Sequence, residues 1–212
     1  MSDLPRMVAV VGTNASGKSG LGVELALRYG GEVISADSRQ VYRGLDLGSG
    51  KDLAEYGATP HHLIDIADPR ETFHLAGFLE AAHRAIAGIA AQGRLPVLAG
   101  GTALYLDALL NGYRLEDAEP DWALRAELDA LPIEALAAEL RRYPEAAAGF
   151  DQWDNKNRVR RALELARTGK QLSQAAAPPS YRTLILGVYF PREEVHARIA
   201  ARLDARFEAG MI

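Results

Sequence analysis

The most constraining stretch of this chain is a short apolar run followed at once by a glycine-rich loop. Residues 8–11 are Val-Ala-Val-Val, and the loop that follows reads Gly12-Thr13-Asn14-Ala15-Ser16-Gly17-Lys18-Ser19. The run predicts a buried parallel strand. The loop fits the pattern G-x-x-x-x-G-K-S/T, in which backbone N–H groups surround a phosphate, the lysine adds a cation and the last hydroxyl is available to Mg²⁺. The stretch therefore predicts phosphate binding on an α/β scaffold, without saying which phosphate is bound.

Size and composition limit the class of protein. The chain has 212 residues, of which 48% are hydrophobic and 25% charged, which suits one α/β domain with an appended part. No apolar run approaches the roughly 18 residues of a membrane span, and residues 1–6 lack a signal-peptide core, so we expect a cytoplasmic protein with no membrane contact. Without cysteine there are no disulfides or thiolate metal sites. The net charge of -4 argues mildly against a general nucleic-acid binder.

Two further strand ends are expected beside the phosphate loop. A strand over 32–36 runs into Asp37, and a later one over 95–99 runs into Gly100-Gly101-Thr102. Because ligands collect at the carboxyl ends of parallel strands, we expect Asp37 and Thr102 on the same edge of the sheet as the loop. Asp37 fits a helix N-cap equally well, and the Gly-Gly junction also fits a plain tight turn. The residues alone leave both alternatives open.

Apolar spacing predicts the helices between these strands. One helix follows residue 19, with a buried face formed by Leu21, Leu25 and Ala26, and another covers 72–92 with Thr72 as its cap. Residues 44–60 look loop-rich. The adjacent histidines at 61 and 62 point to opposite faces of an extended chain, so they do not predict a two-ligand metal site.

The middle of the chain has a different character. An acidic connector over 116–121 precedes an Ala- and Leu-rich helical stretch from 122 to about 142, interrupted at Pro132. Between Asn155 and Lys170 six basic residues stand against one acidic residue. Such a basic patch usually just faces solvent and binds nothing. Arg158 and Arg161 share one side of the helix, however, and an arginine guanidinium can bind phosphate through two N–H groups at once. An Ala/Pro/Ser-rich loop over 171–181 then leads to a strand over 183–190.

We therefore predict an α/β fold, a P-loop NTPase-like parallel sheet flanked by helices, with a helical insertion domain. Residues 1–112 form the first part of the core, 113–182 the insertion, and 183–212 the return to the core. A helix after Pro191 carries one stripe of apolar residues and one of arginines, namely Arg198, Arg202 and Arg206.

A series of segments, in order and at family-like spacing, resembles the tRNA dimethylallyltransferase (tRNA isopentenyltransferase) family. Besides the loop over 12–19 the likeness includes Asp37-Ser38-Arg39-Gln40-Val41-Tyr42-Arg43-Gly44, Pro60-His61-His62-Leu63-Ile64-Asp65, Gly100-Gly101-Thr102-Ala103-Leu104-Tyr105 and Arg160-Arg161-Ala162-Leu163-Glu164. The resemblance extends from the N-terminus to residue 212.

The resemblance implies a Mg²⁺-dependent transferase. It would move a dimethylallyl group from dimethylallyl diphosphate to N6 of the adenosine on the 3′ side of the anticodon (adenosine 37) in a tRNA anticodon stem-loop. The loop Gly12, Thr13, Asn14, Ala15, Ser16, Gly17, Lys18 and Ser19 would hold the diphosphate, with Mg²⁺ near Ser19. Asp37 would be the general base, in a catalytic set completed by Lys18, Ser19, Thr102 and Arg202, the last of these near the diphosphate. The implied tRNA contacts are Asp37, Ser38, Arg39, Gln40, Thr102, Arg125, Asn157, Arg158, Val159, Arg160 and Arg161. We expect a monomer.

The sequence departs from the family pattern in three places. Thr13 and Asn14 stand where the family usually has proline and threonine, so donor affinity is expected to differ. Gly48-Ser49-Gly50-Lys51 replaces the common Gly-Thr-Ala-Lys. Family members continue for many tens of residues past the position of Gly210, so we expect the C-terminal part of the family to be missing here and the tRNA-binding surface to be incomplete.

Other functions share the phosphate loop. A small-molecule P-loop kinase would transfer a phosphoryl group from ATP, and an adenylate isopentenyltransferase would prenylate free AMP or ATP. The basic helix of the insertion favours a macromolecular acceptor over a free nucleotide. In a non-catalytic nucleotide-binding module, Asp37 and Arg202 would share no function.

Overall fold

The computed structural model describes residues 4–113, 121–169 and 180–211. The chain divides into two compact units, one of Met1–Tyr113 and Ala177–Ile212, the other of Arg114–Ala176. The insertion was predicted over 113–182. The predicted acidic connector, apart from Asp121, and most of the predicted loop over 171–181 lie outside the described residues.

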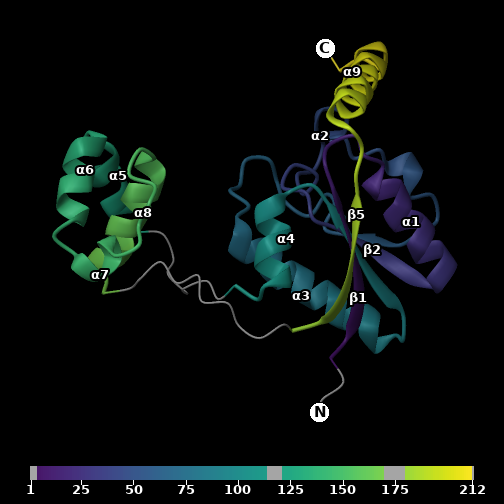
Figure 1. The fold of residues 1–212 in the computed structure, drawn as a ribbon, viewed down its shortest axis with the longest axis horizontal. Coiled ribbons are helices and arrows are strands. Elements are labelled where there is room, and N and C mark those ends of the chain that lie inside the picture. Colours follow the sequence, from purple (N-terminus) through teal and green to yellow (C-terminus); the bar gives the residue numbers. More distant parts are fainter. Residues whose placement is uncertain (1–3, 114–120, 170–179, 212) are drawn as a thin grey trace. The chain divides into compact units, whose positions relative to one another are not determined.

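A five-stranded parallel sheet forms the centre of the first unit (Figure 1), in the order β3-β2-β4-β1-β5. β1 (Arg6–Gly12) lies between β4 (Leu95–Gly100) and β5 (Arg182–Val188), while β2 (Gly31–Ser35) pairs with β4 and with the short β3 (His61–His62). Val11 at the end of β1 is in register with Gly100 at the end of β4. The predicted parallel sheet is confirmed, and the phosphate loop begins at its carboxyl edge.

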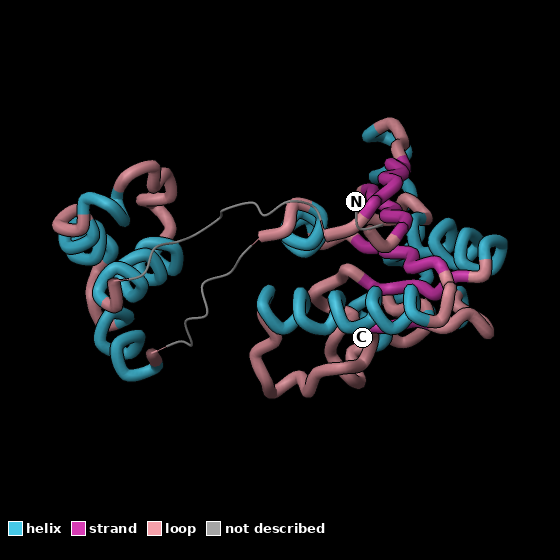
Figure 2. Tube along the Cα trace, turned by 90° about the horizontal axis from the view of Figure 1, so that it is seen from below, coloured by secondary structure: helices cyan, strands magenta, loops and turns pink. Residues whose placement is uncertain are grey.

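Helices cover both faces of this sheet (Figures 1 and 2). α1 (Lys18–Tyr29) packs on one face, where its buried residues Val23 and Ala26 join a core with Val10, Val33 and Val97. On the other face lie α3 (Leu75–Ala91) and α4 (Ala103–Leu110), which pack against a core that includes Met7, Ile34 and Leu98. Because successive strand residues point to opposite faces, the central strands are apolar throughout and are buried from both sides.

Two details of the predicted helices are wrong. In α1 the face toward the sheet carries Val23, whereas Leu21 is 36% exposed. Gly22 allows this approach, since a Cβ there would lie 3.0 Å from the side chain of Ala99. The N-cap of α3 is His74 rather than Thr72, and its side chain accepts a hydrogen bond from the Gly77 N–H at 3.4 Å.

The region over 44–60 contains α2 (Asp46–Ser49) and a 3-10 turn, η1 (Leu53–Glu55). A buried lysine holds it in place. Lys51 Nζ donates to the carbonyl of Tyr42 at 2.7 Å and to Asp46 at 2.7 Å, and it also binds Asp65. Burial would lower the pKa of Lys51, but the hydrogen bonds to Asp46 and Asp65 outweigh it and raise that pKa. A stretch predicted to be loop-rich is therefore held by a buried ion-pair cluster.

The second unit is a group of helices with its own core. They are α5 (Trp122–Asp129), α6 (Ile133–Leu140), α7 (Pro144–Ala147) and α8 (Lys156–Arg167). Pro132 separates α5 from α6 and is the N-cap of α6, as expected for a residue that cannot continue a helix. The buried core contains Leu128, Leu136, Leu140, Val159 and Leu163.

After β5 the chain of the first unit continues into α9 (Arg192–Glu208). No residue of this helix is fully buried, and its apolar stripe of Ile199, Leu203 and Phe207 is more than 40% exposed. Among the described residues, no helix is both long enough and apolar enough to cross a membrane.

Candidate active site

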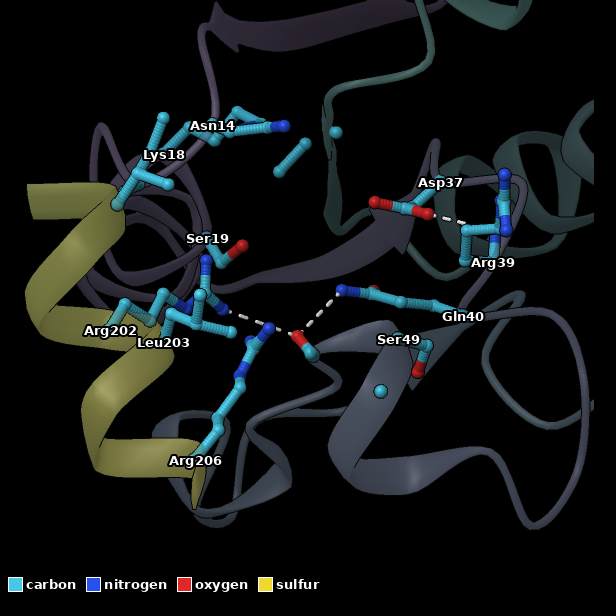
Figure 3. A pocket seen from close by; sticks show the side chains of 16 residues that line it. Asn14, Lys18, Ser19, Asp37, Arg39, Gln40, Ser49, Arg202, Leu203 and Arg206 are labelled. Carbon is cyan, nitrogen blue, oxygen red and sulfur yellow. Dashed lines mark hydrogen bonds between the residues drawn. The ribbon is translucent and has the colours of Figure 1, made fainter. Parts of the chain in front are cut away.

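The carboxyl edge of the sheet opens into a cavity of about 310 Å³ (Figure 3). Segments that are far apart in the sequence form its wall: the phosphate loop, the turn after β2, the end of α2 with the glycine that follows it, and α9. The residues that line it include Asn14, Lys18, Ser19, Asp37, Arg39, Gln40, Ser49, Gly50, Arg202, Leu203 and Arg206. Most of the site residues that were expected in the first unit therefore line this one cavity.

The phosphate loop has the backbone shape that its glycines predict. Gly17 has φ +80°, in the left-handed region that glycine adopts without cost, and Ala15 has φ +57°. Lys18 Nζ donates to the Thr13 carbonyl at 2.9 Å and lies beside Gly101, where a Cβ would be 3.3 Å from it. Asn14 lines the cavity, so the departure from the family pattern at this position changes the wall of the cavity itself.

Positive charge accumulates around Lys18. Burial lowers the pKa of the Lys18 ammonium; Asp37 opposes the shift, and the nearby Arg202 guanidinium adds to it. The two cations are therefore close enough to repel each other. An anion bound between them would relieve that repulsion, which is the electrostatic condition for a phosphate or diphosphate site.

Asp37 and Thr102 are brought together by backbone contacts between two strand ends. The Ser38 N–H donates to Thr102 Oγ1 at 2.9 Å, and the Thr102 N–H donates to the Ala36 carbonyl at 3.1 Å. Gly100 makes this approach possible, because a Cβ there would lie 2.2 Å from the Ala36 oxygen. The Gly-Gly junction is thus a close contact between strand ends.

The alternative reading of Asp37 as a helix N-cap is wrong. Asp37 Oδ1 accepts a hydrogen bond from the Arg39 N–H at 2.8 Å, which closes a local turn that no helix follows. This bond occupies one carboxylate oxygen and orients the group toward the cavity (Figure 3). A carboxylate held in this way can accept a proton from a ligand.

The carbonyl oxygen of Gly50 is shared by two side chains that line the cavity (Figure 3). Gln40 Nε2 donates to it at 3.0 Å and Arg202 Nη2 at 3.4 Å. Gln40 is buried, and its Oε1 accepts a hydrogen bond from Ser35 Oγ at 2.9 Å. Both ends of the Gln40 side chain are therefore engaged inside the protein, where they connect β2 to the residues after α2.

An acidic residue outside the predicted site binds the arginines of α9. Asp52 forms an ion pair with Arg202 and lies 3.7 Å from Arg206 Nη2. Sequence reasoning missed Asp52, Gly50 and Arg206 as parts of this site. The four-residue spacing of the arginine stripe was the only signal for Arg206, and nothing in the sequence indicated what the stripe would face.

The residues present fit a Mg²⁺ ion that is bound together with phosphate oxygens. Ser19 lines the cavity and supplies a hydroxyl, the one protein ligand expected for this ion. The described residues contain no group of three or more His, Cys, Asp or Glu that could hold a metal. Mg²⁺ commonly uses one or two protein ligands together with substrate phosphates and water, so this donor set suits it.

The tRNA contacts expected in the second unit are Arg125 and residues 157–161. Arg125 and Arg161 both bind the buried carboxylate of Glu164, at 3.0 and 2.8 Å, and Arg160 binds Asp129. Asn157 and Arg158 are exposed. The side chain of Val159 is wholly buried in the core and offers no surface to an RNA, and the tRNA contact expected at this position stays a prediction.

Comparison with known proteins gives a consistent result. The model of the IPP transferase family matches residues 40–212, and that of isopentenyl transferase matches residues 5–59. The tRNA dimethylallyltransferase 2 of Shewanella sediminis is 45% identical over 208 residues, which cover 97% of this chain and 69% of that protein. The tRNA dimethylallyltransferase of Thermomicrobium roseum is 46% identical over 215 residues, covering 97% and 65%.

Solved structures resemble this chain over the same extent. The full-length tRNA isopentenylpyrophosphate transferase of Bacillus halodurans has a TM-score of 0.67 and 40% identity, with 97% of this chain and 67% of that chain covered. A eukaryotic dimethylallyltransferase, solved acting on tRNA, has a TM-score of 0.84 and 28% identity, with 97% and 53% covered. The chain thus spans about two thirds of the bacterial relatives and about half of the eukaryotic one.

Proposed function

Because this chain belongs to the IPP transferase family, we propose that it transfers a dimethylallyl group from dimethylallyl diphosphate to N6 of the adenosine on the 3′ side of the anticodon in tRNA. Its relatives are named tRNA dimethylallyltransferases, and a solved neighbour acts on tRNA. One observation on this chain carries the proposal. The carboxylate of Asp37 lines the same cavity as Lys18 of the phosphate loop and Arg202 of α9.

The donor diphosphate would lie on the phosphate loop. As the allylic C–O bond breaks, negative charge grows on the departing diphosphate. Lys18 and Arg202 line the cavity, so together with N–H groups of the loop they would stabilise this charge with little reorganisation. A Mg²⁺ ion bound with the diphosphate at Ser19 would supply further positive charge.

The acceptor amine would lie beside the carboxylate of Asp37. An exocyclic adenine amine is a weak nucleophile, and it must lose a proton as the new C–N bond forms. One oxygen of Asp37 is held by the Arg39 N–H, which leaves the other to take that proton. General-base help of this kind is typically worth ~10²–10⁴-fold in rate. The adenosine must first leave its stack, at a cost of a few kcal/mol that is smallest in an unpaired loop.

The same features weigh against the alternatives. The family match and the names of the relatives weigh against a kinase, which would move the terminal phosphoryl group of ATP. An enzyme for free AMP would not need the exposed Asn157 and Arg158 on α8, which suit contacts to an RNA backbone. We also propose that the protein is a cytoplasmic monomer.

Radiolabelled dimethylallyl diphosphate and Mg²⁺, incubated with the protein and either tRNA or AMP, would test the proposal. We expect label in the tRNA, in anticodon loops with adenosine on the 3′ side. Label in AMP alone would indicate an adenylate isopentenyltransferase. A parallel reaction with ATP labelled at its terminal phosphate would detect a kinase, and phosphate transfer there would contradict the proposal.

A further inference from the structure

Arg206 lies on the same side of α9 as Arg202, four residues later and therefore one helical turn away. Both side chains line the cavity that holds the phosphate loop and Asp37 (Figure 3). Arg202 occupies the position that the family resemblance assigns to diphosphate binding. No role has yet been given to Arg206.

The guanidinium of Arg206 has an unused donor. Its side chain is 20% exposed, yet its Nη2 atom is buried and has no hydrogen-bond acceptor among the described residues. Its ion pair with Asp52, at 3.7 Å, is beyond hydrogen-bond distance, and Asp52 also binds Arg202. Leaving a buried charged donor without an acceptor is costly, so a turn of the guanidinium that brought this N–H group to a ligand oxygen in the cavity would be favourable.

Gly50 shows how closely the two arginines approach the wall of the cavity. A Cβ at this position would lie 2.1 Å from Arg206 Nη2 and 3.2 Å from Arg202 Nη2. The two guanidinium groups therefore lie over the same peptide and are adjacent to each other. Only a residue without a side chain leaves room for both.

The charges facing the cavity favour a ligand with several negative charges. Among the described residues, four cationic side chains line it, Lys18, Arg39, Arg202 and Arg206, against one carboxylate, Asp37. Asp52, which pairs with Arg202 and Arg206, lies beside their guanidinium groups and does not line the cavity itself. A guanidinium presents its N–H groups in a planar fork that matches two phosphate oxygens. A diphosphate has enough oxygens to accept hydrogen bonds from the Lys18 ammonium and from both guanidinium groups at the same time.

We propose that Arg206 binds the diphosphate beside Arg202, so that two guanidinium groups from α9 and one ammonium from the phosphate loop surround the leaving group. This rests on the proposed function for the identity of the diphosphate. Arg206 would contribute both to holding the donor and to stabilising the charge that develops as the allylic bond breaks.

Inorganic pyrophosphate is a suitable probe, because it carries the charge and oxygens of the leaving group without the prenyl chain. Its dissociation constant would be measured calorimetrically with Mg²⁺ for the full chain and for Arg206→Met, Arg206→Lys and Arg198→Met. Arg198 is the matched control: it lies on the same helix, binds Glu194 and stacks on the ring of Phe190, and it does not line the cavity.

We expect Arg206→Met to weaken pyrophosphate binding about tenfold, the value for one charge-assisted hydrogen bond. Arg206→Lys should give a smaller loss, since it keeps the charge and loses the fork. Arg198→Met should bind like the unaltered protein. Unchanged affinity in Arg206→Met, or an equal loss in Arg198→Met, would overturn the proposal. If Arg206→Met does not fold, Arg206→Lys decides, and unchanged affinity in that variant would likewise overturn it.

A prenyl-transfer assay on the same samples separates this proposal from the proposed function. If the unaltered protein prenylates no tRNA while Arg206→Met still loses pyrophosphate affinity, the proposed function fails and the role of Arg206 stands. If the unaltered protein prenylates tRNA and Arg206→Met binds pyrophosphate normally, the role of Arg206 fails alone.

Discussion

Thr102 accepts a 2.9 Å hydrogen bond from the backbone N–H of Ser38, across a separation of 64 positions in the sequence. Thr102 Oγ1 also lies 3.2 Å from Ser38 Oγ, to which it donates. The turn that carries Asp37 is therefore fixed to the end of β4 as well as to β2, its own strand. The position of the proposed base, Asp37, therefore depends on both β2 and β4.

Thr102→Val tests this connection, because valine keeps the shape of threonine and removes the oxygen. The Ser38 N–H then loses its acceptor, and the turn with Asp37 becomes less well fixed. We expect turnover in tRNA prenylation to fall about tenfold, with pyrophosphate affinity close to that of the unaltered protein. Thr102→Ser keeps the oxygen and serves as the control. Equal turnover in the valine and serine variants would contradict the argument.

Asp37→Asn tests the proposed base itself. The amide keeps the size of the carboxylate and cannot take the proton, so we expect turnover to fall ~10²–10⁴-fold. Affinity for tRNA, measured by filter binding, should change little. Asp68→Asn is a suitable control, since Asp68 binds Arg70 in an exposed pair away from the cavity. An Asp37→Asn enzyme that turns over as fast as this control would exclude Asp37 as the base.

Gly50→Ala should disturb the site through the backbone. Gly50 has φ +68°, which strains an L-residue by about 1 kcal/mol, and its new Cβ would strike the guanidinium of Arg206. We expect a loss of unfolding free energy of about 1–2 kcal/mol in urea and weaker pyrophosphate binding. Gly57→Ala is the matched control, because Gly57 also has a positive φ, +51°, while nothing lies within 4 Å of its Cβ position and it does not line the cavity. Equal pyrophosphate affinity in the two variants would refute the role of Gly50.

Glu164→Gln should destabilise the second unit. Glu164 is buried and accepts hydrogen bonds from Arg125, Arg161 and the Asp121 N–H. Removing its charge takes away the buried anion that both arginines bind, at a cost of about 3 kcal/mol. Both tryptophans of the chain, Trp122 and Trp153, lie in this unit, so the midpoint of tryptophan fluorescence in urea reports on it directly. An unchanged midpoint would count against the buried ion pairs as a source of stability.

The pH dependence of the same variant gives a second test. Burial would raise the pKa of Glu164, but the hydrogen bonds from Arg161, Arg125 and the Asp121 N–H outweigh it and hold that pKa below its usual 4.5. Because the folded pKa is the lower one, the stabilisation is complete above about pH 4.5 and is lost as the pH falls through the folded pKa. The difference in stability between the unaltered chain and Glu164→Gln should therefore shrink below pH 4.5. A difference independent of pH would contradict this.

The sequence predicted the sheet and the phosphate loop well because both follow from local patterns. The apolar run over 8–11 and the glycines of the loop determine a buried strand and a left-handed turn with little help from the rest of the chain. Asp37 and Thr102 were placed correctly at one edge because parallel strands all end there. These features need only the order of strands along the chain.

Features that depend on distant partners were not predictable. Lys51 reads as a surface residue in a polar stretch, and only the folded chain brings Asp65 to it. Val159 stands within a basic segment, yet the helical period turns it into the core. Glu164 looked like the single acidic residue of a cationic patch, whereas it neutralises part of that patch from inside. In each case the decisive partner lies elsewhere in the fold.

The contact between Gly100 and Ala36 has a consequence for how such an enzyme can diverge. Main-chain atoms of two neighbouring strand ends touch here, so the spacing between the end of β4 and the turn that carries Asp37 is set by the backbone and by the absence of a side chain at position 100. Asn14 lines the cavity and takes no part in this contact, so a change at position 14 would alter the wall of the cavity and leave the turn with Asp37 in place. The lining of the cavity and the position of Asp37 therefore depend on different atoms at the same edge of the sheet.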